Sequence, residues 1–88
     1  MADVDVVLAG GMRTPFGDFG KSYRYVPLAA LGVHAAKACL EKAGVAATTV
    51  DHLVFGNVVP VDYDGHFVSR KVALGAGLPI ESSAFSVN

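Results

Sequence analysis

The sequence predicts an α/β fold with a mainly parallel sheet, in the order β-α-β-α-β. Three short apolar runs, at 4–9, 52–58 and 82–88, alternate with two segments of helical character. The stretches KAGVAATTVDHLVFGN and GAGLPIESSAFSVN form a weak internal repeat, because each runs from a helix end through Ala-Gly into a strand that closes on Asn. Strands that alternate with helices pair in parallel through right-handed crossovers.

The first element is the run 4–9, which is short, largely β-branched and bounded by Gly10 and Gly11. Such a run is typical of a strand that is covered on both faces. Residues 10–26 are rich in glycine and aromatic residues and show no periodicity, so they predict a long ordered loop. Loops of this length are usually functional or interfacial.

The strongest helix signal covers residues 27–43. Pro27 suits the first helical position, where its missing N–H costs nothing, and Gly44 is expected to end the helix. An apolar stripe follows the 3.6-residue period and a polar group falls opposite it. The stripe contains Leu28, Leu31, Ala35, Ala38 and Cys39, and the polar group contains His34, Lys37 and Glu41.

The second half repeats the pattern with a strand at 52–58, a helix at 65–76 and a strand at 82–88. Gly56 inside the middle strand suggests a bulge or a close backbone approach. Asp64 suits the helix N-cap, and Gly77 and Pro79 are expected to stop the helix. The packed side of that helix and its edges are predicted to contain Phe67, Val68, Lys71, Val72 and Leu74. In the last strand, Phe85 and Val87 are expected to share a half-buried face.

The sequence reaches Asn88 within this last strand, and no turn or cap follows it. A chain of 88 residues buries only roughly 60 to 65% of its unfolded surface on folding alone. At 52% hydrophobic and 17% charged residues, the composition is more apolar than a small independent globule requires. Residues 1–88 are therefore predicted to be part of a domain, incomplete alone and completed by a further polypeptide segment.

Charge and cysteine usage exclude several classes of function. The net charge is −1 without a basic run, which argues against nucleic acid or an anionic membrane as partner. His34, His52 and His66 are scattered and Cys39 is the only cysteine, so neither a metal site nor a disulfide framework is predicted. The sequence shows no export signal and no apolar run approaching ~18 residues, so a cytoplasmic location is expected.

Ligands of parallel sheets bind beyond the carboxyl ends of the strands, so the loops after residues 9, 58 and 88 should share the working edge. The glycines at 10, 11, 17 and 20 do not form a G-x-G-x-x-G pattern that opens a helix at once, which disfavours dinucleotide binding. An independent small α/β module that binds a nucleotide nevertheless stays open as an alternative.

Four polar or reactive side chains have alternative interpretations. Arg13 can grip an anion or anchor its loop through backbone carbonyls, and Arg70 can bind substrate or tie a loop or subunit contact; anchoring is favoured for both. His66 can equally reach a cleft or face solvent. Cys39 is best explained as a small buried hydrophobe near a helix C-terminus. No nucleophile and base pair is evident.

Taken together, several motifs resemble the N-terminal end of a thiolase, the family that includes acetyl-CoA acyltransferases, acetyl-CoA acetyltransferases and β-ketothiolases. The resemblance runs along the whole chain and is carried by RTPFGDFGKSYRYVPLAALG, KAGV, VDHLVFGNV and SRKVALGAGLPIESSAFSVN. It implies a thiolase-like fold, of which this chain is the first β-α-β-α-β portion of the N-terminal half. In the family, the nucleophilic cysteine of a C-x-S-G turn is the third residue after the V-N pair.

What the resemblance implies about function is acyl transfer between CoA thioesters, through a cysteine thioester. The reaction is thiolysis of a 3-ketoacyl-CoA or the reverse Claisen condensation of acetyl-CoA, as in fatty acid metabolism. CoA or acyl-CoA is then a substrate, and no tightly bound cofactor is expected. The partners implied are the segment that carries the rest of the thiolase and further copies of the pair, in a dimer or tetramer. A non-catalytic thiolase-like binding or scaffold protein is the alternative.

The resemblance assigns supporting roles and no catalytic residue within the 88 residues. Val87 and Asn88 match the strand that presents the nucleophile and pairs with its twin across the dimer. The motif positions that brace the active-site edge and subunit contact are matched by Arg13, Asn57 and Arg70. Many thiolases have G-Q-N-x-x-R where this chain has GHFVSR, so His66 and Phe67 are expected at the edge of the acyl pocket, where they affect chain-length preference.

Overall fold

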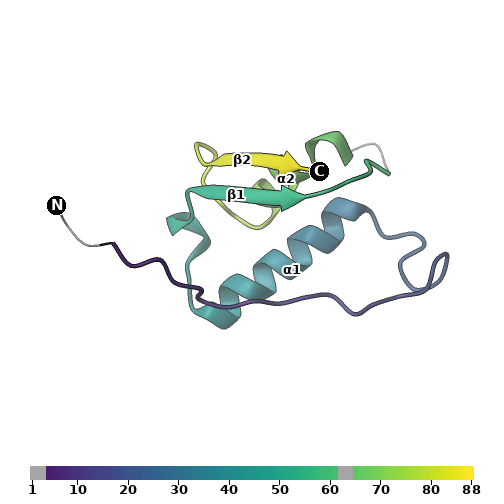
Figure 1. Ribbon diagram of the computed structural model, residues 1–88, viewed down its shortest axis with the longest axis horizontal. Coiled ribbons are helices and arrows are strands. Elements are labelled where there is room, and N and C mark those ends of the chain that lie inside the picture. Colours follow the sequence, from purple (N-terminus) through teal and green to yellow (C-terminus); the bar gives the residue numbers. More distant parts are fainter. Residues whose placement is uncertain (1–3, 62–64) are drawn as a thin grey trace.

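The computed structural model describes residues 4–61 and 65–88. Helix α1 (Leu28–Ala43) is followed by the short 3-10 helix η1 (Ala47–Thr49) and strand β1 (His52–Gly56). The 3-10 helix η2 (Gly65–Phe67), helix α2 (Val68–Gly75) and strand β2 (Ser83–Val87) complete the order. Strands β1 and β2 pair in parallel, with Leu53 opposite Ala84 (Figure 1). The α/β class with parallel strand pairing is thus confirmed.

Helix α1 forms where the periodicity predicts it, with one difference at its start. Pro27 lies at the N-cap with extended backbone (ψ 145°), and the helix begins at the next residue. The C-terminus ends at Gly44, whose φ of 70° is left-handed. This turn lets the Val45 N–H donate to the Leu40 carbonyl at 3.0 Å. The polar group His34, Lys37 and Glu41 is exposed, as expected.

Replacing Gly44 by alanine is expected to lower the stability of the helix end. A side chain in the left-handed region costs about 1 kcal/mol, and no described heavy atom lies within 4 Å of the position that the new methyl would take, so the cost is conformational and not steric. Thermal unfolding followed by far-ultraviolet circular dichroism measures the loss. Gly44→Asn is the control, because asparagine tolerates this backbone; equal stability of Gly44→Ala and the wild type would contradict the prediction.

Helices α1 and α2 cross closely because glycines lie at the crossing. A Cβ on Gly32 would lie 2.6 Å from a methyl of Val72 and 3.0 Å from the Phe55 ring. A Cβ on Gly75 would lie 2.5 Å from a methyl of Val33. Since the Phe55 side chain of β1 reaches α1, both helices lie on the same face of the sheet. Val72 at this crossing is only 1% exposed.

The predicted helix 65–76 is divided into η2 and α2, and its buried stripe differs from the expected one. The proposed N-cap, Asp64, lies outside the described residues. Val68 and Val72 are buried as predicted, but Phe67, Lys71 and Leu74 are exposed. The buried face instead adds the small residues Ser69, Ala73 and Ala76. Leu53 and Ala84 of the strands pack against the buried cluster of Ala73, Ala76 and Leu78, and small side chains allow that close approach.

The sheet has one covered and one open face. Leu53, Phe55 and Ala84 are half-buried toward the helices. The other face, which we call the open sheet face, consists of His52, Val54 and Gly56 of β1 and their partners Ser83, Phe85 and Val87 of β2. Phe85 and Val87 therefore share a face as predicted, but it is the exposed one. The ring of Phe85 contacts that of His52, with 5.1 Å between centroids.

The expected strand at 4–9 is not formed, which corrects the prediction of three strands. This segment has no regular structure, and its apolar side chains are exposed, with Val6 at 93% and Leu8 at 100%. A strand needs a hydrogen-bonded neighbour, and within the described residues β1 pairs with β2 alone. β-Branched composition by itself does not supply that neighbour.

The long loop at 10–26 is ordered by local contacts. The Tyr23 hydroxyl donates to the Pro15 carbonyl, and the Tyr23 ring packs over Gly17. Backbone hydrogen bonds from Lys21 to Asp18 and from Arg24 to Lys21 close successive turns.

No helix in the described part of the chain is both long and apolar enough to cross a membrane.

Candidate functional site at the carboxyl ends of the strands

A cavity of about 250 Å³ lies where β1 and β2 end, and we call it the carboxyl-edge cavity. It is lined by Asn57, Val58, Pro60, His66, Ser86, Val87 and Asn88. Parallel pairing brings the two strand ends together, and the Asn57 N–H donates to the Val87 carbonyl at 2.7 Å. Four residues singled out from the sequence therefore meet here, namely Asn57, His66, Val87 and Asn88.

Different elements supply the polar groups of this cavity. Asn57 follows β1 and is half-buried, Asn88 follows β2, and His66 belongs to η2 and is exposed. Amides and imidazole both donate and accept hydrogen bonds, so the cavity can orient a polar reacting group. Among the described residues, the side chains that line it include no thiol and no carboxylate. What the described residues offer here is hydrogen bonding and shape.

Sequence reasoning did not single out Val58, Pro60 and Ser86, which also line the cavity. Their positions in the sequence could have indicated them, since each lies within three residues of Asn57 or Asn88 at a strand end. Phe67 does not line the cavity; its side chain is 68% exposed beside His66. Of the two residues expected at the acyl-pocket edge, the structure brings only His66 to this cavity.

Arg70 is half-buried on α2 and lies away from the cavity. Its Nη1 donates to the Ser82 carbonyl at 2.9 Å, and its Nη2 donates to the Ile80 carbonyl. Both acceptors lie in the turn that precedes β2, so the guanidinium ties α2 to the entrance of that strand. This geometry corresponds to the loop-tying alternative.

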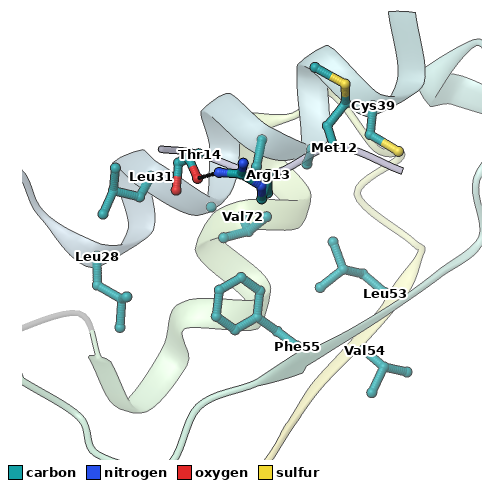
Figure 2. Close-up of a pocket in the computed structure, with 13 residues that line it drawn as sticks. Met12, Arg13, Thr14, Leu28, Leu31, Cys39, Leu53, Val54, Phe55 and Val72 are labelled. Carbon is teal, nitrogen blue, oxygen red and sulfur yellow. Dashed lines mark hydrogen bonds between the residues drawn. The ribbon is translucent and has the colours of Figure 1, made fainter. Parts of the chain in front are cut away.

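Arg13 is exposed, and the hydrogen bond and ring contact that it makes within the described residues are with Thr14 and Phe16, its neighbours in the chain. Its Nη1 donates to the Thr14 carbonyl at 3.3 Å, and its guanidinium carbon lies 5.1 Å from the centroid of the Phe16 ring. It is one of the residues that line a second hollow of about 540 Å³ between α1 and β1, the α1 groove (Figure 2). The structure thus does not bring Arg13 to the carboxyl-edge cavity.

The α1 groove is mainly apolar. Leu28 and Leu31 of α1 face Leu53 and Phe55 of β1 across it. Cys39 is half-buried in its lining, in an apolar setting that suits the small hydrophobe predicted from the sequence. In the described ranges, no three His, Cys, Asp or Glu side chains gather closely enough to hold a metal ion.

Comparison with known protein sequences identifies the family. The family described as "Thiolase, N-terminal domain" matches residues 6–88. An acetyl-CoA acetyltransferase of Clostridioides difficile is 36% identical over 84 residues, which cover 96% of this chain and 78% of that relative. An acetyl-CoA acetyltransferase of Schizosaccharomyces pombe is 38% identical over 88 residues, which cover all of this chain and 22% of that relative.

Solved structures agree with the sequence matches. A human mitochondrial 3-ketoacyl-CoA thiolase, crystallised in complex with CoA, matches with a TM-score of 0.88 and 35% identity over 91% of this chain. An acetyl-CoA acetyltransferase from Syntrophomonas wolfei matches with a TM-score of 0.82 and 31% identity over 92% of this chain. This chain covers 20% of each of those two chains. By sequence and by fold, the chain belongs to the thiolase family, as a segment that matches the family's N-terminal domain.

Proposed function

We propose that this chain is the N-terminal portion of a thiolase that transfers acyl groups between CoA thioesters. A further polypeptide segment completes the domain and supplies the reactive cysteine. The carboxyl-edge cavity is the observation that supports this proposal, because it gathers Asn57, His66, Val87 and Asn88 at the strand ends. Ligands of parallel sheets bind at this edge.

In this proposal, the chain supports the chemistry and does not perform it. The cysteine thiolate of the completing segment attacks the thioester carbonyl, a tetrahedral oxyanion forms, and CoA leaves as the acyl group passes to sulfur. Val87 and Asn88 hold the strand that leads to the nucleophile, and Asn57 braces the neighbouring strand end. Arg70 fixes the entrance of β2, which sets the position of the whole strand.

The substrates proposed are 3-ketoacyl-CoA with CoA, or two acetyl-CoA molecules in the reverse direction. The proposal is supported by the similar proteins, which are named acetyl-CoA acetyltransferase or 3-ketoacyl-CoA thiolase. One of the similar structures was crystallised with CoA. We further propose that pairs of this chain and its completing segment assemble into a dimer or tetramer, with Arg13 at the subunit contact. A cytoplasmic location is proposed for this assembly.

Reconstitution tests the proposed function. The chain is co-expressed with the Syntrophomonas wolfei acetyl-CoA acetyltransferase from which the equivalent N-terminal segment has been removed; we call the product the reconstituted pair. We expect thiolysis of acetoacetyl-CoA by the reconstituted pair and by neither piece alone. Consumption of the 3-ketoacyl-CoA, followed by its ultraviolet absorbance, is the measurement.

Two results would contradict this function. Thiolysis by the 88-residue chain alone would show that it carries its own nucleophile. A pair that forms but neither cleaves acetoacetyl-CoA nor forms an acyl-cysteine detectable by intact mass would favour the non-catalytic scaffold. Removal of the cysteine from the completing segment is the matched control, because it should abolish activity without preventing assembly.

A further inference from the structure

The helix-covered face of the sheet changes from apolar to polar at the carboxyl ends of the strands. Alternate residues of a strand point to the same face, and Figure 2 shows Phe55 of β1 pointing toward the helices. Asn57 continues this side of β1 and is half-buried, as Phe55 is. On β2, Ser86 is the partner of Phe55, so Ser86 and then Asn88 continue the same side. The apolar covered face therefore ends in two amides and a hydroxyl.

His66 brings a fourth polar side chain to this place from the helix layer. It belongs to η2, which leads directly into α2, and α2 packs on both strands. The polar lining of the carboxyl-edge cavity thus consists of an imidazole, a hydroxyl and two amides. Each of these groups can donate a hydrogen bond. The cavity is therefore suited to a ligand group that accepts hydrogen bonds.

Acidic side chains lie at the opposite end of the sheet. Asp51 and Glu81 precede β1 and β2, and they line a separate hollow at the amino ends of the strands. No carboxylate side chain of the described residues lines the carboxyl-edge cavity. A negatively charged acceptor at the carboxyl edge would thus meet donors and no opposing carboxylate of this described lining, and hydrogen bonds to a charged acceptor are the stronger kind.

The volume of the cavity suits one end of a ligand. Its volume of about 250 Å³ is below the ~300 to 1,000 Å³ of pockets that take a whole drug-sized molecule. In the proposed function, β2 leads through Asn88 toward the reactive cysteine. An acyl group held by that cysteine therefore begins beside the cavity and can place its far end in it.

We propose that the carboxyl-edge cavity binds the far end of the acyl group and selects acyl groups that end in a carboxylate over alkyl groups of the same length. The inference rests on the proposed function, and it adds the substrate class. An alkyl end would cut the amides, the imidazole and the hydroxyl off from water without replacing their hydrogen bonds, which is unfavourable. A carboxylate accepts hydrogen bonds from these groups instead.

His66 is the side chain through which this selectivity is best tested. It lies outside both strands, so its substitution leaves the pairing of β1 and β2 in place. Asn57, by contrast, follows β1 directly, and its N–H is bonded to the Val87 carbonyl. Leucine at position 66 replaces the imidazole donor by an apolar side chain, which should favour an alkyl end.

Adipyl-CoA and hexanoyl-CoA are the probes, because their acyl groups have the same number of carbons and end in a carboxylate and a methyl group. Each thioester is titrated into the reconstituted pair from which the cysteine of the completing segment has been removed, and the heat released gives its Kd. We expect the wild-type pair to bind adipyl-CoA more tightly than hexanoyl-CoA. His66→Leu should lower the ratio of the two affinities at least ~10-fold, as expected for one lost charge-assisted hydrogen bond.

Two further variants separate selectivity from a structural effect. His34→Leu is the matched control, because His34 is an exposed histidine of α1 that does not line the cavity, and it should keep the wild-type ratio. His66→Gln should keep most of the preference, since glutamine still donates hydrogen bonds. A merely structural role of His66 would weaken the binding of both thioesters alike and leave their ratio unchanged.

Equal affinity ratios for His66→Leu and the wild type would overturn the proposed selectivity. Binding of hexanoyl-CoA as tightly as adipyl-CoA by the wild-type pair would also overturn it. The proposed function fails separately, when the pair that keeps its cysteine forms no acyl-cysteine with acetyl-CoA. The affinity ratio is measured without the cysteine, so it then still decides which acyl ends the cavity selects.

Discussion

Replacing Gly32 with alanine is expected to force α1 away from α2 and lower the free energy of unfolding by about 1 to 2 kcal/mol. The added methyl would lie 2.6 Å from a Val72 methyl and 3.0 Å from the Phe55 ring. Overpacking of this kind costs about 1 to 3 kcal/mol, whereas alanine in a helix gains only about 0.5 to 1 kcal/mol over glycine. The steric cost therefore wins. Urea unfolding of the reconstituted pair, followed by circular dichroism, measures the change.

A double substitution tests whether the contact with Val72 is the cause. Val72→Ala alone should also destabilise, because it removes two methyl groups from a side chain that is 1% exposed. Combined with Gly32→Ala, however, it removes the methyl that the new side chain strikes. The double variant should be more stable than the sum of the two losses by about 1 kcal/mol, as expected for residues in contact. Strict additivity would show that the crossing relaxes elsewhere.

Arg70→Ala is expected to cost about 2 kcal/mol and to loosen β2 more than β1. The substitution removes two charge-assisted hydrogen bonds, to the carbonyls of Ile80 and Ser82, each of the kind worth about 1.5 to 3 kcal/mol when buried. The estimate lies below the sum of the two because water can reach the Ile80 carbonyl, whose residue is exposed. Hydrogen exchange of the β2 amides in the reconstituted pair should accelerate.

Arg70→Lys is the matched control for this prediction. Lysine keeps the charge but lacks the planar fork that reaches both carbonyls at once. We therefore expect a loss between those of the wild type and Arg70→Ala. If both variants exchange like the wild type, the guanidinium does not hold the entrance of β2, and its role would lie in a subunit contact instead.

The helices and strands that were predicted well are those with strong local signals. Leu28 to Ala43 carries a regular apolar stripe and ends at Gly44, so local geometry fixes both its type and its end. The prediction of the buried side of α2 was partly wrong. Whether Phe67 or Ser69 is buried depends on which neighbouring elements pack against the helix. Small Ser69 and Ala73 are buried, and large Phe67 is 68% exposed.

The candidate site was predicted from topology rather than from any single residue. Once two strands are parallel, their carboxyl ends must share an edge, so Asn57 and Asn88 could be placed together from the sequence. The positions of Arg13 and Arg70 could not be predicted from the sequence. The position of each guanidinium depends on which backbone carbonyls lie within hydrogen-bonding distance after folding. The residue types alone allow several partners.

The motifs of the amino-acid sequence were enough to indicate the family. Helical periodicity, strand composition and glycine stops are local properties of the chain, and they predicted α1, α2 and the parallel pairing of β1 and β2. Only the tertiary structure decides which face of the sheet the helices cover. This packing leaves the side chains of Val54, Phe85 and Val87 exposed on the other face. The same is true of the run 4–9, which stays unpaired within the described residues. Both outcomes depend on neighbours, since a strand exists only where a second strand satisfies its hydrogen bonds and a face is buried only where another element packs on it.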